Sequence, residues 1–217
     1  MRRQTISDVL MVKTKDGMWT NFRDVGTLDG KEVKDRSARA LALFTQSGVD
    51  VGATLRRIAD ESGRLNLGGG GNFNVPTLPL QILDAAHRDR FRFGSGGAER
   101  IDGVTAAVVT YRETKAPTFI RSIQKNEPVY ISGKLWIAPD DGRVLRSELA
   151  LHDEPNHLST AVIVNYRRIP ELDMLMPIEM WERYTPDQPF ATYIERRAKY
   201  ANYRRFTVST SDSPSAK

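Results

Sequence analysis

The sequence contains no cysteine. This absence excludes a disulfide-bonded scaffold, a thiol nucleophile and a zinc site built on cysteine, and it is compatible with both the cytosol and a bacterial periplasm. Long hydrophobic runs are also missing: the longest, such as residues 162–164, fall far short of the ~20 apolar residues of a membrane-spanning helix. Residues 4–8 are polar where a secretion signal would be apolar. The sequence therefore predicts neither a membrane span nor a signal segment.

The charge balance is mildly basic, with a net charge of +5 and a pI of about 9.5. A surplus of this kind favours anionic partners such as phosphate, lipid headgroups or polysaccharide. No change of composition marks a linker, so we predict a single domain over residues 1–208. Residues 209–217 are rich in serine and are predicted to form a disordered tail.

Four Asp-Gly dipeptides, at 16–17, 29–30, 102–103 and 141–142, lie beside stretches rich in Val, Ile, Thr and aromatic residues. Asp-Gly readily adopts the positive φ angles of tight hairpin turns, so the pattern predicts antiparallel sheet. A meander of two or three strands is expected over residues 5–33. From Phe91 onward we expect an up-and-down series of strands at 91–93, 104–112, 118–122, 132–138, 143–152, 160–168, 177–184 and 191–206.

Helical spacing of apolar residues occurs between these two groups of strands. It predicts one helix from Asp35 to Phe44 and a second over residues 50–65, whose apolar face includes Leu55, Ile58 and Leu65. A short third helix is expected over residues 77–86, provided that Pro79 lies in its first turn. The predicted fold is therefore α+β: a strongly curved antiparallel sheet, or half-open β-barrel, with short helices packed in its concave face.

No catalytic or metal-binding constellation is evident, and we predict no cofactor. The glycine run at 68–71 follows a helix and lacks the Gly-Lys-Ser/Thr of a phosphate-binding loop. His152, Asp153, Glu154 and His157 offer metal-ligand types, but their spacing matches no recognised metal motif and is typical of a solvated turn. A nucleophile, a base and an orienting group cannot be assembled from the sequence alone.

Two groups of residues are candidates for a binding role. Basic and aromatic residues interleave over 193–206, as in platforms for single-stranded nucleic acid, although strand alternation places Arg196 and Arg197 on opposite faces. Pairing of these arginines with Glu195, Glu182 and Glu148 explains the pattern equally well. The tryptophans Trp19, Trp136 and Trp181 either fill the core or line an apolar pocket.

The second half of the chain resembles periplasmic lipoprotein carriers. The resemblance is carried by Trp-Ile-Ala-Pro-Asp-Asp-Gly-Arg-Val-Leu-Arg at 136–146, Val-Ile-Val-Asn-Tyr at 162–166 and Leu-Met-Pro-Ile-Glu-Met at 175–180. Trp19, Phe-Arg-Asp-Val at 22–25, Asp-Gly at 29–30 and Asn-Phe-Asn-Val-Pro-Thr at 72–77 look like an uncharacterised group of bacterial secreted proteins. The carrier resemblance implies a half-open barrel that holds acyl chains or other lipids, and a periplasmic or secreted location.

We therefore predict a non-enzymatic carrier or sensor that binds a lipid, an acyl chain or a lipidated protein between helices and sheet. The expected lining residues are Leu55, Ile58, Phe73, Trp136 and Trp181, and the expected hinge is Gly68, Gly69, Gly70 and Gly71. One alternative is a module for an anionic polymer, nucleic acid or polysaccharide, that uses Arg196, Arg197, Arg204 and Arg205. Another is an interaction module without a small ligand.

Overall fold

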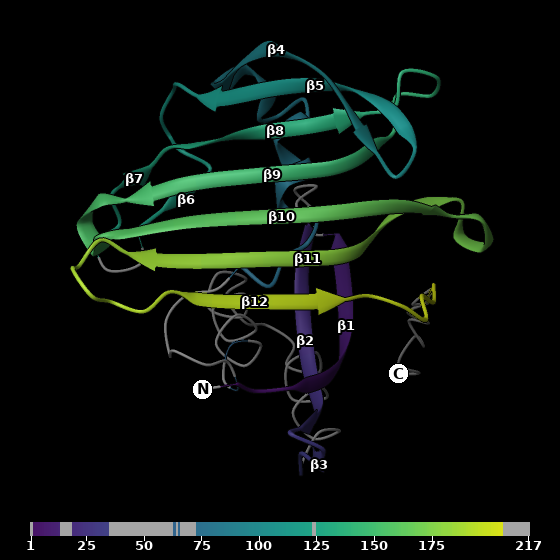
Figure 1. Cartoon of the computed structure of the whole chain (residues 1–217), viewed down its shortest axis with the longest axis vertical. Coiled ribbons are helices and arrows are strands. Elements are labelled where there is room, and N and C mark those ends of the chain that lie inside the picture. Colours follow the sequence, from purple (N-terminus) through teal and green to yellow (C-terminus); the bar gives the residue numbers. More distant parts are fainter. Residues whose placement is uncertain are drawn as a thin grey trace, which may run out of the picture.

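The computed structural model describes residues 2–13, 19–34, 63, 65, 73–122 and 125–205. Its strands are β1 (Thr5–Lys13), β2 (Trp19–Leu28), β3 (Lys31–Glu32), β4 (Phe91–Ile101), β5 (Val104–Glu113), β6 (Ile120–Arg121), β7 (Pro128–Val129), β8 (Ile131–Ile137), β9 (Val144–Asp153), β10 (Leu158–Ile169), β11 (Met174–Pro186) and β12 (Ile194–Lys199). Its short 3-10 helices are η1 (Leu78–Leu83), η2 (Arg88–Arg90), η3 (Glu154–Asn156) and η4 (Pro170–Leu172) (Figure 1).

A seven-stranded antiparallel sheet dominates the fold, with the strand order β12-β11-β10-β9-β8-β5-β4. Neighbours in the sheet follow one another along the chain, which confirms the predicted up-and-down order. The one departure is the pair β6-β7, which comes between β5 and β8 along the chain and forms a separate two-stranded ribbon. The sheet stays open, since β12 and β4 are its two edges.

Asp-Gly turns close two of the hairpins as predicted. Asp29 and Gly30 have φ angles of 49° and 81° between β2 and β3, and Asp102 and Gly103 have φ angles of 47° and 85° between β4 and β5. Positive φ at both central residues gives the turn a twist that matches the flanking strands. Residues 16–17 lie outside the described part of the chain.

The N-terminal strands form their own three-stranded sheet, in the order β1-β2-β3. The prediction of one continuous bent sheet was therefore wrong. Figure 1 shows β1 and β2 running roughly perpendicular to the main strands, behind β11 and β12. The side-chain amide of Asn21 donates to the carbonyl of Asn74 at 3.0 Å, and Phe22 and Val25 are buried. A strand that crosses the main sheet in this way cannot join its hydrogen-bonded ladder, so it packs through side chains.

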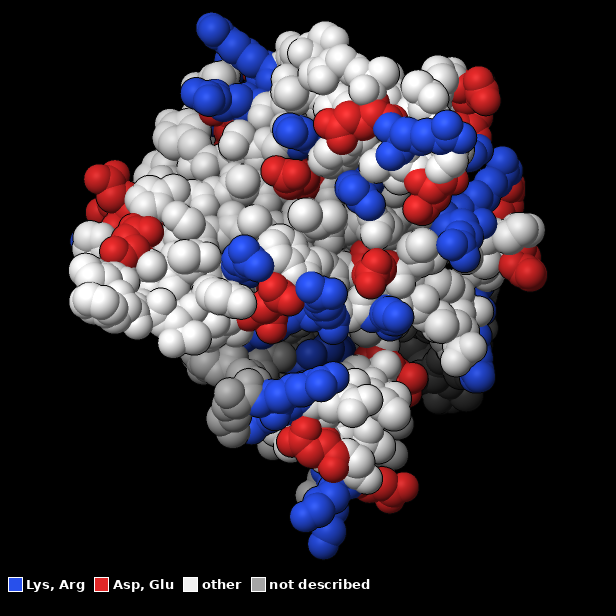
Figure 2. Space-filling model, viewed as in Figure 1, with Lys and Arg blue, Asp and Glu red and all other residues white. Residues whose placement is uncertain are grey.

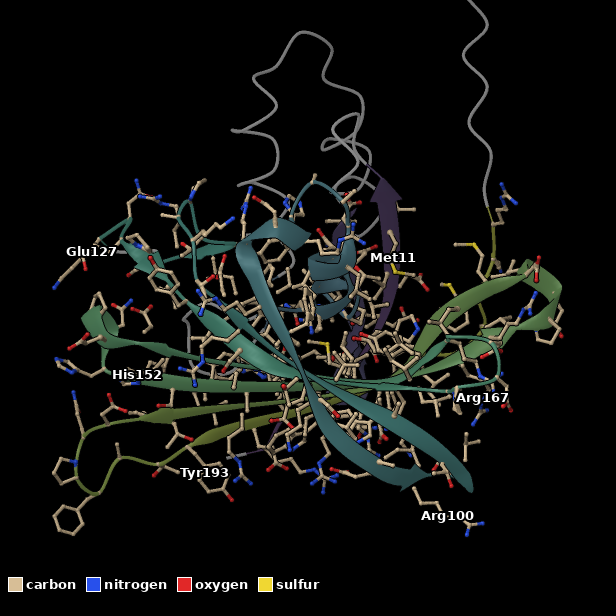
Figure 3. The ribbon with its side chains drawn as sticks, turned by 90° about the horizontal axis from the view of Figure 1, so that it is seen from above. Met11, Arg100, Glu127, His152, Arg167 and Tyr193 are labelled. Carbon is tan, nitrogen blue, oxygen red and sulfur yellow. The ribbon has the colours of Figure 1, made fainter. Side chains whose placement is uncertain are left out.

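The main core covers one side of the seven-stranded sheet, which we call the core face. Leu135, Leu149, Val162 and Val164 point into it from β8, β9 and β10 and are fully buried. Ile82 of η1 packs on the same cluster. Alternate residues of these strands point to the opposite side, which we call the outer face. Figure 3 shows Met11 of β1 on one side of the sheet and Arg100, near the β4–β5 turn, on the other.

Helix η1 confirms the expected short helix, and its Pro79 lies in the first turn. A proline is tolerated there because the first amides of a helix have no intrahelical partner. The predicted helices over 35–44 and 50–65 fall almost entirely outside the described residues, so their packing in the concave face stays a prediction. Leu65 itself is half-buried, and its carbonyl accepts a hydrogen bond from the Arg3 guanidinium at 2.9 Å. Among the residues described, no helix has the length and apolar composition that crossing a membrane requires.

Buried hydroxyl groups organise the centre of the core face. The Tyr166 hydroxyl donates to the carbonyl of Pro76 at 2.9 Å and lies 2.9 Å from the Ser147 Oγ atom. The Tyr111 hydroxyl donates to the carbonyl of Glu148 at 2.8 Å. Burial raises the pKa of both phenols, so they stay neutral donors. The bond to Pro76 ties the segment that leads into η1 to β10.

Candidate functional site

The residues predicted to line a lipid cavity lie on different faces of the sheet. Phe73 packs on the core face, where its backbone amide donates to the Tyr184 hydroxyl at 3.1 Å. Trp136 is buried on the outer face, in a small cluster with Ile101 and Val108, and its indole nitrogen donates to Glu99 at 2.9 Å. Trp181 is half-buried on that outer face as well, because it alternates along β11 with the buried Met180. The structure brings the two tryptophans to one face but separates them from Phe73.

Leu55, Ile58 and the hinge residues Gly68, Gly69, Gly70 and Gly71 lie outside the described residues. Their predicted roles as lining residues and as a hinge stay predictions.

The four arginines of the predicted polymer site also diverge. Arg196 points to the core face, where its Nη1 atom lies 3.8 Å from a carboxylate oxygen of Glu182. Arg197 points to the outer face and pairs with Glu195 at 3.1 Å. Arg204 and Arg205 are exposed beyond the end of β12. The expected pairing of arginines with Glu182 and Glu195 is confirmed, and the four side chains form no single stripe.

A groove of about 720 Å³ crosses the outer face instead. Its floor follows from the strand register: on β8, β9 and β10 the paired outward residues are Ser132, Ala150 and Ala161, all of them small. The same row continues to Arg112 on β5 and to Arg183 on β11. Small side chains therefore form a trough across the middle strands, with an arginine at each end.

A second row of polar residues forms one wall of this groove. His152 pairs with Ser159, and Ser159 pairs with Thr185, across β9, β10 and β11. Tyr130 directly precedes β8 and also lines the groove, and Tyr193 directly precedes β12. The two tyrosines are 50% and 53% exposed. Figure 3 shows His152 and Tyr193 at the same end of the sheet.

The two arginines at the ends of the groove differ in how they are held. The Arg183 guanidinium donates to Glu195 at 3.1 Å and lies over the rings of Trp181 and Tyr193, at 4.9 Å and 4.8 Å from their centres. Arg112 is exposed and lies opposite Arg92 on the neighbouring β4. Neither Arg112 nor Arg92 forms an ion pair with any residue in the described ranges. Two adjacent cations without a carboxylate partner make this end of the groove attractive to an anion.

Figure 2 shows the outer face from the same side as Figure 1. Charged side chains of both signs crowd the right half of this face, whereas the left half, over the C-terminal ends of β9 and β11, has a central uncharged area with basic groups at its upper margin and acidic groups at its left margin. The groove rows lie toward that end of β9, since they contain Ala150 and His152.

Ser159, His152 and Asp187 line up beside the groove, which the sequence did not indicate. The Ser159 Oγ atom lies 3.1 Å from Nδ1 of His152, and the His152 Nε2 atom lies 3.6 Å from a carboxylate oxygen of Asp187. These residues meet because β9 and β10 pair directly and Asp187 follows β11. In the described part of the chain, no three His, Cys, Asp or Glu side chains are placed to hold a metal ion.

Glu182, on β11 next to the edge strand β12, is a buried carboxylate with 3% of its surface exposed. It accepts hydrogen bonds from the Asn74 amide and the Tyr184 hydroxyl, each at 3.1 Å, and it faces Arg196. Burial raises its pKa, and the opposing effects of Arg196 and of the Asn74 amide are smaller. Its position links β11 and β12 to the segment that begins at Phe73.

We expect lower pH to stabilise the wild type relative to Glu182→Gln. The raised folded-state pKa means that the folded protein holds a proton which the unfolded chain, titrating near about pH 4.3, has released. This contribution to stability is fully present below the unfolded pKa and is lost as the pH rises through the folded pKa. Urea unfolding of both proteins between about pH 7 and about pH 4.5 measures it.

Glu195→Gln is the matched control for this experiment. A hydrogen bond from Arg183 lowers the pKa of Glu195, so the contribution of this group is lost as the pH falls. Over the same pH range, the difference in stability from the wild type should therefore grow for Glu182→Gln as the pH falls and stay nearly constant for Glu195→Gln, whose change comes only below about pH 4.3. The same change for both variants in this range would contradict the assignment of Glu182 as a carboxylate with a raised pKa.

Comparison with known proteins identifies no relative. No family model, no curated protein and no solved structure matches the chain.

Proposed function

We propose that the protein is a non-enzymatic binding protein that holds an extended anionic ligand in the outer-face groove. The observation that carries this proposal is the row from Arg112 to Arg183, in which a guanidinium stands at each end of a floor of small residues. Arginine presents its donors in a planar fork that matches carboxylate and phosphate groups, so it suits recognition of anions.

The geometry favours binding over hydrolysis at Ser159. Ester or amide hydrolysis by a serine requires donors aimed at the oxyanion, which are commonly backbone amides. Ser159 lies within β10, which is paired with β9 on one side and β11 on the other, so the surrounding backbone amides serve the sheet. The distance of 3.6 Å between His152 and Asp187 is also too long for a hydrogen bond that would orient the ring. We assign Ser159 and His152 to hydrogen bonding with the ligand.

The acyl-chain carrier inferred from the sequence is the second candidate. The observation that favours it is the apolar segment on the core face, where Phe73, Leu78 and Leu80 are only partly buried against the main core. An acyl chain would enter between this segment and the sheet. Its binding would depend on apolar area and would be insensitive to salt.

A salt titration separates the two candidates. We expect fluorescein-labelled polyglutamate, polyphosphate or polygalacturonate to bind with an affinity that falls steeply as NaCl rises. Arg112→Met should weaken binding by roughly tenfold, because a hydrogen bond between charged groups contributes about 1.5–3 kcal/mol. Fluorescence anisotropy measures both effects.

Arg100→Met is the control, since Arg100 is exposed on β4 near the hairpin turn, away from the groove residues. It removes the same charge and should leave binding nearly unchanged. Equal losses of affinity in both variants would show that binding depends on overall charge and not on the groove. If a fluorescent fatty acid binds without salt dependence and none of the polyanions binds, the acyl-chain carrier is favoured.

A further inference from the structure

The groove runs across the strands and not along them. Each of its floor positions, Ser132, Ala150 and Ala161, comes from a different strand. Arg112 and Arg183 are separated by the four steps β5-β8-β9-β10-β11. At ~4.8 Å a step, their Cα atoms lie about 19 Å apart. The ligand that contacts both arginines is therefore a linear molecule of about that length.

An extended peptide does not suit this direction. Peptides that bind sheets usually add to an exposed edge, where main-chain hydrogen bonds provide the affinity. The floor of the groove belongs to β8, β9 and β10, and each of these strands is paired on both sides. Their backbone groups are already used, so recognition here has to come from side chains.

Single-stranded nucleic acid fits less well than a sugar polymer. Nucleic-acid platforms stack successive bases on aromatic side chains. The centre of this groove contains Ala150 and Ala161. The exposed aromatic residues at the two ends of the polar row are Tyr130, which lines the groove, and Tyr193, whose ring lies against the groove residue Arg183. Between them stand groups that both donate and accept hydrogen bonds, Ser159, Thr185 and His152, which match the many hydroxyls of a sugar.

We infer that the groove binds a linear acidic oligosaccharide that lies across the strands. A pyranose unit in a linear polymer is similar in length to one strand-to-strand step, so the groove spans about four sugar units. The terminal carboxylates contact Arg112 and Arg183, the hydroxyls contact the polar row, and the apolar faces of the end sugars stack on Tyr130 and Tyr193. This inference rests on the anion-binding groove proposed above and specifies its ligand.

Oligogalacturonides of two to six units test the inference by calorimetry. We expect affinity to rise with each unit up to about four or five and then to level off, since later units lie beyond the arginines. Methyl esterification of the carboxylates should abolish binding. Tyr130→Ala should weaken binding of the four-unit oligogalacturonide by roughly tenfold, as expected for the loss of one stacking contact. It should change the affinity for the two-unit oligogalacturonide much less.

Two further probes distinguish failure of the inference from failure of the proposed function. If polyphosphate or oligo-dT binds with the sensitivity to Arg112→Met described above and oligogalacturonides do not, the groove binds anions but the sugar assignment is wrong. If no anionic probe binds, both are wrong. An affinity that keeps rising up to six units, or that is unaffected by Tyr130→Ala and methyl esterification, would also overturn the inference.

Discussion

Replacing Gly133 by alanine is expected to destabilise the protein by about 3–5 kcal/mol, or to prevent folding. Gly133 lies on β8 opposite Tyr111, whose side chain extends over it to reach the carbonyl of Glu148. A Cβ atom at this position would overlap the Glu148 carbonyl oxygen and would lie 2.6 Å from the Tyr111 hydroxyl. The carbonyl belongs to the neighbouring strand and cannot move away without breaking the ladder.

Urea unfolding measures this loss, with Gly142→Ala as the matched control. Gly142 adopts a positive φ, 71°, and a Cβ atom there would meet nothing within 4 Å. It should lose only about 1 kcal/mol, the usual cost of that backbone conformation for a residue with a side chain. If Gly133→Ala does not fold, Tyr111→Phe tests the same contact by removing only the hydroxyl, with an expected loss of about 1 kcal/mol. Stability of Gly133→Ala within about 1 kcal/mol of wild type would refute this packing.

Replacing Ala161 by tryptophan should abolish binding of the anionic ligand, with a loss of affinity of at least about a hundredfold. Ala161 lies at the centre of the groove floor, and its side chain points to the outer face and is only half-buried. An indole ring there would occupy the path between Arg112 and Arg183. Because the new ring extends toward solvent, the free energy of unfolding should change little.

The control for this variant is Thr105→Trp. Thr105 is exposed on β5 opposite Arg100, near the β4–β5 turn and away from the groove residues. Anisotropy with the same labelled polyanion, together with urea unfolding, measures both variants. Wild-type affinity in Ala161→Trp would place the ligand elsewhere, and equal losses in the two variants would point to a general effect of the added ring.

The strands were predictable because their signals are local. Asp29-Gly30 and Asp102-Gly103 mark hairpins through the φ preferences of two adjacent residues, and alternation along each strand separates the core face from the outer face. Another local preference, the tolerance of the first helical turn for proline, predicted the position of Pro79 in η1. The separate N-terminal sheet was not predictable, because β1 and β2 carry ordinary strand patterns and only packing decides which sheet they join.

The groove could not be predicted from the sequence, for a different reason. Ala150 and Ala161 carry no functional signal on their own, and the row from Arg112 to Arg183 exists only once the register of five strands is known. Irregularities in that register, such as the shift between Trp136 and Ile137, change which residues face one another. A tight connection between β9 and β10, if assumed, would have suggested the pairing of His152 with Ser159. The position of Asp187 beside His152 could not have been predicted in this way.

The groove floor consists of the three strands that hydrogen-bond to neighbours on both sides at the middle of the sheet. Such strands usually open only when the whole domain unfolds, so the floor keeps its shape in the absence of a ligand. A ligand that binds there does not have to order the backbone beneath it, and the conformational entropy lost on binding comes mainly from the arginine and tyrosine side chains and from the ligand itself. Affinity at this site is therefore governed by how stiff the ligand is, and a stiff chain of the correct length is favoured over a flexible one with the same charges.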